Sequence, residues 1–164
     1  MQGTPRDEAM MRAAIAEAER ARGSTGDNPW VGSVICDEAG VVIAAGHTQG
    51  PGEDHAEIVA LRRAKELGSS LELATLYSTL EPCSFHGRTP ACAKAIVESG
   101  VRRVVTAIRD PNPLVDGAGN QILRDAGIEV IEGVCAAEVT RSLADWIRAY
   151  HPAAVARYLR ESEA

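Results

Sequence analysis

Three residues whose side chains bind transition metals constrain the fold of this chain most. They are His55, Cys83 and Cys92, and Glu57 follows closely after the first of them. Zn²⁺ binds imidazole and thiolate groups tetrahedrally, and a catalytic zinc site keeps its fourth position for water. Three protein ligands and a spare carboxylate therefore predict a catalytic zinc site. The fold must then bring these separate segments together.

Other interpretations of the same residues stay open at this point. In many zinc sites only two residues separate the paired cysteine ligands, as in Pro-Cys-x-x-Cys. Here the eight residues 84–91 separate Cys83 from Cys92. His55 and Glu57 could be an ordinary histidine and acid at a helix start. A structural zinc site would need a fourth protein ligand, for which Cys36 or His86 are the candidates. We favour the catalytic site because His86 lies in a segment that we expect to face a substrate.

Periodicity predicts strands that alternate with helices after an initial helix and a hairpin. Thr4, Pro5 and Asp7 form a typical helix start, and Gly23 ends that helix. Such an order predicts a three-layer α/β/α sandwich with a mixed, roughly five-stranded sheet. Strands are expected at 31–36, 41–45, 73–80, 104–108 and 128–131, and further helices at 55–67, 91–99, 117–126 and 136–150.

The predicted elements place the metal-binding residues at one edge of the sheet. Cys83 follows a strand, and ligands of open α/β sheets gather at the carboxyl ends of strands. His55 and Cys92 lie near helix starts, where the helix dipole favours negative charge. This position lowers the pKa of a cysteine and supports metal binding by the thiolate.

Composition narrows the class of protein further. The chain has 164 residues, is 45% hydrophobic and has a formal net charge of -6. These values predict a folded domain and argue against binding to nucleic acid, which needs a basic surface. We expect Cys36 and Cys135 to be buried or half-buried apolar residues. The N-terminus is polar and no apolar run approaches the ~20 residues that span a bilayer, so we expect a cytoplasmic protein without membrane contact.

Several motifs resemble the deaminase domain of the bifunctional riboflavin-biosynthesis enzymes, which belong to the cytidine deaminase-like zinc hydrolases. Zinc deaminases share a His-x-Glu motif followed by Pro-Cys and a second Cys. Residues 82–92 are similar to the Pro-Cys-Ser-x-x-Gly-(Arg/Lys)-Thr-Pro-x-Cys loop of that family. Residues 28–32 are similar to its Asn-Pro-x-Val-Gly motif, and residues 79–83 and 109–113 also match. The resemblance covers roughly residues 6 to 147.

The resemblance implies a fold, a cofactor and a reaction. It implies a cytidine deaminase-like fold with one Zn²⁺ per chain, held by His55, Cys83 and Cys92, and it implies Glu57 as the catalytic acid/base. The reaction would be hydrolytic deamination of 2,5-diamino-6-ribosylamino-4(3H)-pyrimidinone 5′-phosphate, with Glu57 moving a proton from water to a ring nitrogen and then to the departing amine. A related free base, nucleoside or secondary-metabolite precursor is the alternative substrate.

The resemblance also implies contacts with the substrate, with Asn28 against its ring and with Asp110 and Asn112 at its ribose and phosphate end. Arg88 is the candidate phosphate contact, because its guanidinium is a permanent planar cation in an otherwise acidic chain. Asn28 could instead serve only a turn, as could Asp110 and Asn112, and Arg88 could be a solvated surface cation. Phe85 stands where the family often has histidine. The full set of candidate contacts is Asn28, His47, Ala56, Phe85, His86, Arg88, Asp110 and Asn112.

The remaining expectations concern domains and partners. We expect a zinc-dependent deaminase domain at 1–150 and a C-terminal tail at 151–164, without the reductase half of the bifunctional enzymes. Expected partners are a small aminopyrimidine, further copies of the chain in a homo-oligomer, and a separate reductase. A non-catalytic zinc module is an alternative that the presence of Glu57 disfavours. A nucleic-acid deaminase is another, and the acidic balance of the chain disfavours it.

Overall fold

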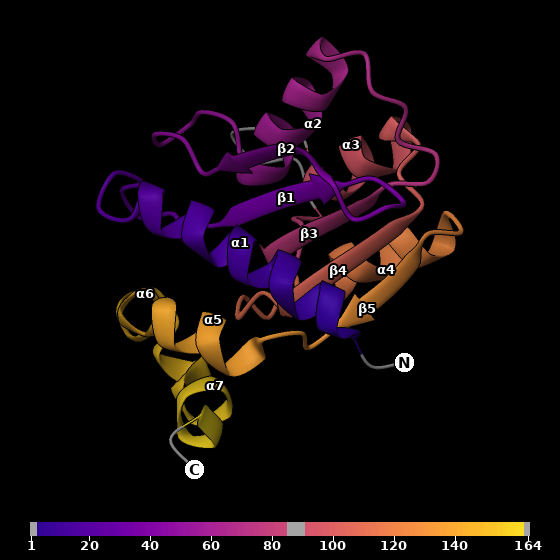
Figure 1. Ribbon diagram of the computed structural model, residues 1–164. Helices are drawn as coiled ribbons and strands as arrows, with labels where there is room; N and C mark the ends of the chain where they lie inside the picture. Colours follow the sequence, from indigo (N-terminus) through magenta and orange to yellow (C-terminus); the bar gives the residue numbers. More distant parts are fainter. Residues whose placement is uncertain (1–2, 85–90, 163–164) are drawn as a thin grey trace.

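A mixed five-stranded sheet forms the middle of three layers in the computed structural model, which describes residues 3–84 and 91–162 (Figure 1). The strands lie in the order β2-β1-β3-β4-β5. β1 is antiparallel to β2 and β3, whereas β4 is parallel to β3 and β5. This confirms the predicted mixed sheet. The strands are β1 (Gly32–Cys36), β2 (Val42–His47), β3 (Thr75–Leu80), β4 (Arg103–Ile108) and β5 (Glu129–Glu132).

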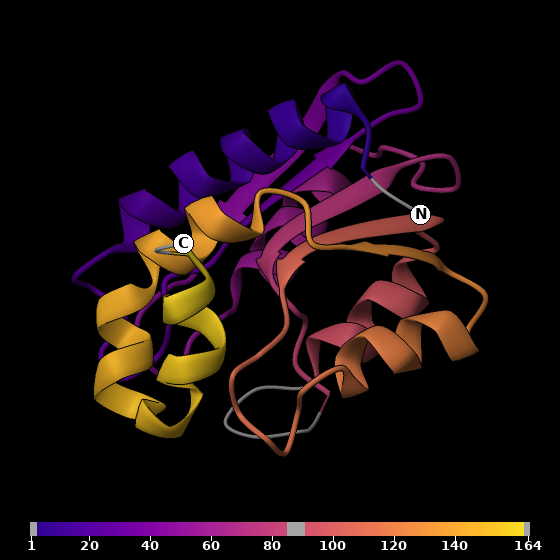
Figure 2. The same cartoon turned by 90° about the horizontal axis from the view of Figure 1, so that it is seen from below.

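Helices cover both faces of the sheet. α1 and α5 lie on one face, and α2, α3 and α4 lie on the other (Figures 1 and 2). The segment with α6, η1 and α7 follows α5 and packs on the same core as α1. The helices are α1 (Pro5–Ala21), α2 (Ala56–Glu66), α3 (Cys92–Ser99), α4 (Ala118–Asp125), α5 (Ala136–Ser142), α6 (Ala144–Tyr150), the short 3₁₀ helix η1 (Pro152–Ala154) and α7 (Val155–Ser162).

The predicted start of α1 is confirmed, and it also anchors the helix to the sheet. The Thr4 hydroxyl accepts from the amide of Asp7, while the Asp7 carboxylate accepts from the amide of Thr4. The same buried carboxylate accepts from Tyr77 Oη at 2.7 Å and from two nitrogens of Arg103 at 2.7 and 2.8 Å. Burial alone raises the pKa of Asp7, but the hydrogen bonds from Arg103, Thr4 and Tyr77 outweigh it and hold that pKa well below its usual range.

Alternating side chains on the central strands divide the core in two. Tyr77 on β3 and Val105 on β4 pack on the side of α1, while Leu76 and Val104 pack on the side of α2, α3 and α4. This period-2 pattern is the one expected for strands covered on both faces. Because helices cover both faces, the ends of the strands are the part of the sheet that a ligand can reach most readily.

The C-terminal part departs from the predictions. The helix expected at 136–150 is divided into α5 and α6 at Leu143, whose side chain is buried in the core. Residues 152–162 form η1 and α7, which the sequence analysis did not predict. The division of the chain at residue 150 stays a prediction. Cys36 is buried and Cys135 half-buried, as expected. In the part of the chain that the structure describes, no helix has the length and hydropathy needed to cross a membrane.

Candidate metal centre and active site

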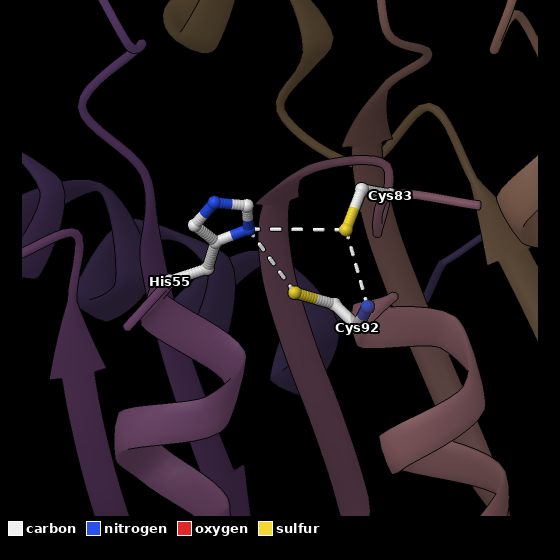
Figure 3. A group of neighbouring side chains, drawn as sticks. All are labelled: His55, Cys83 and Cys92. Carbon is white, nitrogen blue, oxygen red and sulfur yellow. Dashed lines mark hydrogen bonds between the residues drawn. The ribbon is translucent and has the colours of Figure 1, made fainter. Parts of the chain in front are cut away.

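The predicted metal ligands come together where one strand ends and two helices begin. His55 immediately precedes α2, Cys83 follows β3, and Cys92 is the first residue of α3 (Figure 3). The amide of Ala93 donates to the carbonyl of Cys83 at 3.1 Å, so the start of α3 is fixed to the segment that follows β3. Residues 85–90, which lie between the cysteines, are outside the described residues. The carboxyl end of β3 and two helix starts thus form the site, as predicted.

The geometry of the cluster fits one zinc ion. His55 Nδ1 lies 3.2 Å from Cys92 Sγ and 3.8 Å from Cys83 Sγ (Figure 3). One ligand atom from each residue lies within 4.8 Å of the other two. Tetrahedral zinc with ordinary Zn–S and Zn–N bonds places such atoms about 3.5–3.8 Å apart. Cys36 pairs with Thr75 at the opposite end of β3, so it is not a fourth member of this cluster.

The two cysteines differ in their acidity. Cys83 Sγ accepts from the amide of Cys92 at 3.1 Å. Hydrogen bonds from Cys92 and His55 lower the pKa of Cys83 to about 4, whereas the adjacent Cys83 sulfur raises the pKa of Cys92. The amide at the start of α3 therefore supports a thiolate at Cys83. Metal binding must release the remaining thiol proton from Cys92.

Glu57 lies in the first turn of α2, and its side chain is buried. Its Oε1 lies 2.9 Å from the hydroxyl of Ser78 on β3. Burial raises the pKa of Glu57, and the nearby imidazole of His55 opposes that rise. A buried carboxyl group that holds a proton more tightly than usual is suited to moving protons near neutral pH.

A cavity of about 170 Å³ opens beside the cluster. Its apolar wall includes Pro29, Val31 and Leu80, and its polar groups converge from several elements. Among the described lining residues none is lysine or arginine, while three carry carboxyl groups. The lining residues are Asn28, Pro29, Val31, Thr48, His55, Glu57, Leu80, Glu81, Cys83 and Asp110.

The structure brings some predicted substrate contacts to this cavity and leaves others away from it. Asn28 and Asp110 line it, and Ala56 is buried at the first position of α2. His47 instead contacts Glu17, with Nδ1 3.0 Å from Oε2. His47 is absent from the described lining of the cavity.

The remaining predicted substrate contacts are Asn112, Phe85, His86 and Arg88. The amide of Asn112 donates to Asp110 Oδ1 at 2.9 Å, and Asn112 Oδ1 accepts from the amide of Leu114 at 3.0 Å, so Asn112 stabilises a turn. Asn112 is likewise absent from the described lining. The predicted contacts Phe85, His86 and Arg88 lie outside the described residues. The assignment of all these residues to the substrate stays a prediction.

Glu81 lines the cavity but is not among the residues that the sequence singled out. Its buried carboxylate accepts from three backbone amides, those of Asp110 at 3.1 Å, Gly117 at 2.8 Å and Asn120 at 3.1 Å. It thereby ties the segment after β4 to the segment after β3, beside the cavity. Its place directly before Pro82-Cys83 was the available signal, because a charged residue at the end of a buried strand needs partners.

Asp110 carries the second unusual carboxyl group of the cavity. Burial raises its pKa to about 6, the amide of Asn112 opposes this, and the nearby Glu81 adds to it. The proton of Asp110 is therefore exchangeable in the physiological pH range. This carboxyl group can accept or donate a hydrogen bond to a ligand in the cavity.

Known proteins share this fold and much of this sequence. The riboflavin biosynthesis protein RibD of Aquifex aeolicus is 47% identical over 132 residues, which are 80% of this chain and 36% of that protein. The Escherichia coli RibD is also 47% identical, over 80% of this chain and 35% of its own length. The chain thus spans little more than a third of the length of these relatives.

Solved structures of related proteins share the fold of this chain. Acinetobacter baumannii RibD superposes with a TM-score of 0.81 at 44% identity, over 88% of this chain and 39% of that one. A second solved structure comes from Thermotoga maritima and is a diaminohydroxyphosphoribosylaminopyrimidine deaminase/5-amino-6-(5-phosphoribosylamino)uracil reductase. It superposes with a TM-score of 0.78 at 45% identity, over 83% of this chain and 38% of that one. The fold is therefore the cytidine deaminase-like fold that was expected.

A family match covers most of the structure described above. Residues 4–108 match the family described as the cytidine and deoxycytidylate deaminase zinc-binding region. This confirms the resemblance drawn from the motifs and, with the cluster of His55, Cys83 and Cys92, assigns one zinc site to the chain. The chain belongs to the family of deaminases that share this zinc-binding region.

Proposed function

We propose that this chain is a zinc-dependent hydrolase that deaminates an aminopyrimidine. The observation that carries the proposal is the buried carboxyl group of Glu57 in the same cavity as a three-donor zinc cluster. A structural zinc site would need four protein ligands, whereas the described cluster has three. Three described donors and an acid/base beside them together support catalysis; His86, the other candidate for a fourth ligand, lies outside the described residues.

The chain's own residues would divide the work as follows. His55, Cys83 and Cys92 would hold the metal. When bound, Zn²⁺ supplies Lewis acidity that lowers the pKa of water from about 15.7 toward about 7. Glu57 would accept one proton from the attacking water and pass it to a ring nitrogen while the water oxygen bonds to the amine-bearing carbon. It would then take the second proton of that water from the new C–OH group and give it to the departing amine, so that the C–N bond breaks, a C=O group forms and ammonia leaves. Ser78 holds the Glu57 carboxyl group in place through its hydroxyl.

We propose 2,5-diamino-6-ribosylamino-4(3H)-pyrimidinone 5′-phosphate as the substrate, in riboflavin biosynthesis. The names and similarity of the RibD relatives support this choice. The aminopyrimidine ring would lie between the apolar wall and the metal cluster, with Asn28 and Asp110 as polar contacts. Arg88 is the predicted phosphate contact, because guanidinium binds phosphate with two parallel hydrogen bonds.

A second candidate, an uncharged heterocycle, is favoured by the charge of the cavity. Glu57, Glu81 and Asp110 bring three carboxyl groups to its lining, and the described lining has no lysine or arginine. A phosphate close to these groups would meet repulsion unless a cation elsewhere offsets it. The two candidates therefore differ in whether the substrate carries a phosphate.

We further propose a cytoplasmic homo-oligomer whose product passes to a reductase. The free thiols at the metal cluster suit a reducing compartment. Leu67 and Leu73 are 70% and 53% exposed and offer apolar surface for contact between copies. The name of the Thermotoga maritima relative joins a deaminase to a reductase.

An ammonia-release screen of the zinc-loaded chain tests the proposal. The panel contains the phosphorylated pyrimidine, its dephosphorylated form, cytidine, deoxycytidylate and a single-stranded oligonucleotide. The phosphorylated pyrimidine should give the highest kcat/KM. The Arg88→Ala variant should lose about 1.5–3 kcal/mol of transition-state binding on that substrate only, the scale of a hydrogen bond to a charged group. Equal kcat/KM for both forms would exclude the phosphate assignment, and ammonia from the oligonucleotide alone would exclude a small-molecule substrate.

A further inference from the structure

The segment between β4 and α4 carries a side chain into the active-site cavity. This segment, residues 109–117, is called the β4–α4 loop here, and it contains Asp110, whose carboxyl group lines the cavity. Glu81 fixes the loop on its inner side, by accepting from the amides of Asp110 and Gly117. The position of Asp110 therefore depends on how firmly both ends of this loop are held.

The C-terminal helix α7 holds the same loop on its outer side. Arg157 Nη1 lies 3.0 Å from Asp116 Oδ2, and Tyr158 Oη donates to the carbonyl oxygen of Arg109 at 3.1 Å. Figure 2 shows α7, in yellow, beside the loop that leaves β4. The two contacts reach Arg109, directly before Asp110, and Asp116, directly before Gly117. They thus fall next to the two positions that Glu81 holds from inside.

α7 itself is anchored to the body of the molecule. Leu159 is 4% exposed and belongs to the core cluster that also contains Trp146 and Ile147 of α6. Between α7, α5 and the end of β4 lies a hollow of about 330 Å³, lined in part by Arg157 and Tyr158. Arg157 and Tyr158 therefore border a hollow, and their polar contacts to Asp116 and Arg109 are the described hydrogen bonds and ion pair that join α7 to the loop.

The energetics point to a local effect. The side chains of Arg157 and Asp116 are 53% and 36% exposed. Exposed ion pairs contribute little to global stability. Loss of the pair should leave the fold intact, because Pro111 and Val115 of the loop stay buried, and its effect should be confined to local opening of the exposed loop positions.

We propose that α7 is a positioning element of the active site, in which Arg157 and Tyr158 are positioning residues. They fix the outer side of the β4–α4 loop and so hold Asp110 at the substrate cavity. The catalytic part of this inference rests on the proposed function, because it assumes that Asp110 contacts the substrate. The structural part of the inference, that α7 orders the loop, does not rest on the proposed function.

Four variants of the full, zinc-loaded chain test the proposal. Arg157→Ala and Tyr158→Phe each remove one contact, and Asp116→Asn removes the ion pair while it leaves α7 and its packing untouched. Arg141→Ala, an exposed arginine on the neighbouring α5, is the matched control. The measurements are amide hydrogen exchange of residues 109–117 by mass spectrometry, the thermal midpoint, and kcat and KM for ammonia release.

The expected result is faster exchange in the loop, by roughly two- to tenfold, the range for loss of one such contact. KM should rise by a similar factor while kcat stays within about twofold, because Glu57 and the metal ligands are not displaced. The Arg157→Lys variant keeps the positive charge, so its loop exchange rate and its KM should lie close to the wild-type values. Arg157→Ala should add no further change in the Asp116→Asn background, because both remove the same pair. The control should change none of these values.

The possible failures are distinguishable. Unchanged exchange in Arg157→Ala, Tyr158→Phe and Asp116→Asn would overturn the proposal, even if activity fell. Faster exchange with unchanged KM would overturn the positioning of Asp110 by α7. If the wild type released no ammonia from any pyrimidine, the proposed function would fail. The exchange measurement would then still decide whether α7 orders the loop.

Discussion

The hydroxyl of Ser78 lies 2.9 Å from Oε1 of the buried Glu57 and 2.7 Å from the carbonyl oxygen of Leu80. A hydroxyl has one hydrogen to donate, and a carbonyl oxygen can only accept. When the hydrogen points to Leu80, the Ser78 oxygen can still accept from a protonated Glu57. When Glu57 is ionised, the hydrogen can turn to it. Ser78 can therefore hold the carboxyl group in both protonation states that proton transfer requires.

Replacement of Ser78 by alanine tests this relationship. Ser78→Ala should lower kcat by roughly five- to tenfold, which corresponds to the net value of about 1 kcal/mol for one hydrogen bond. KM should change little, because Ser78 is absent from the described lining of the cavity. Ser78→Thr keeps the hydroxyl and should retain most of the turnover. An unaltered kcat in Ser78→Ala would show that Glu57 needs no such support.

The Glu57→Gln variant separates proton transfer from metal binding. The amide keeps the size of the side chain but cannot accept the proton of water. Turnover should fall by at least the ~10²–10⁴-fold that one general acid/base contributes, while zinc content stays at the wild-type level. Zinc content is measured by elemental analysis of the purified protein. Loss of zinc would make Glu57 a metal ligand, and near-normal turnover would remove it from the mechanism.

The four cysteines should divide into two pairs. Cys83→Ser and Cys92→Ser should lower zinc content and thermal stability, since metal binding and folding free energy are linked. Cys36→Ser and Cys135→Ser should keep full zinc, because Cys36 ends β1 beside Thr75, at the end of β3 away from the cluster, and Cys135 immediately precedes α5. A stoichiometric loss of zinc in either of the latter variants would contradict the ligand set.

Stability should depend on pH through the buried carboxylate of Asp7. Its pKa in the folded chain lies well below the usual range, so its contribution is present above the unfolded pKa of about 3.9 and is lost as pH falls below it. Asp7→Asn should cost about 3–5 kcal/mol of unfolding free energy at pH 7, because it removes the buried carboxylate that pairs with Arg103 and leaves only the more exposed Glu129, at 3.6 Å, as a described anionic partner.

Urea unfolding at pH 7 and at pH 3 checks this prediction. The difference between wild type and Asp7→Asn should shrink at pH 3, where the unfolded wild type binds a proton that the folded state resists. Glu8→Gln, an exposed acid on the same helix, is the control and should show a small difference at both pH values. A difference for Asp7→Asn that is as large at pH 3 as at pH 7 would show that the carboxylate charge is not responsible.

The metal site and the sheet could be predicted from the sequence because their signals are local. Zinc ligand types are few, and Cys83 follows a run of strand-forming residues that could be placed without a structure. The start of α1 was predictable for the same reason, since Thr4 and Asp7 satisfy each other within one turn. The family motifs then agreed with a pattern that the residues had already indicated.

The rest depends on distant partners that no local pattern reveals. Glu81 accepts from amides about thirty residues later in the chain, so its role emerges only in the folded chain. The ring of His47 contacts Glu17 of α1, thirty residues earlier in the chain, which no local pattern indicated, and its assignment to the substrate stays a prediction. The helix α7 was missed although Val155, Tyr158 and Leu159 have helical spacing, because a short amphipathic stretch after a proline gives a weak signal.

A zinc titration of the metal-free chain tests the central claim most directly. Zn²⁺ is added in steps, and the initial rate of ammonia release from the phosphorylated aminopyrimidine is measured at each step. We expect no release without metal, a linear rise in the rate with added zinc, and a plateau at one zinc per chain. Full ammonia release from the metal-free chain, or none at one bound zinc, would contradict the assignment of this site as a zinc-dependent deaminase centre.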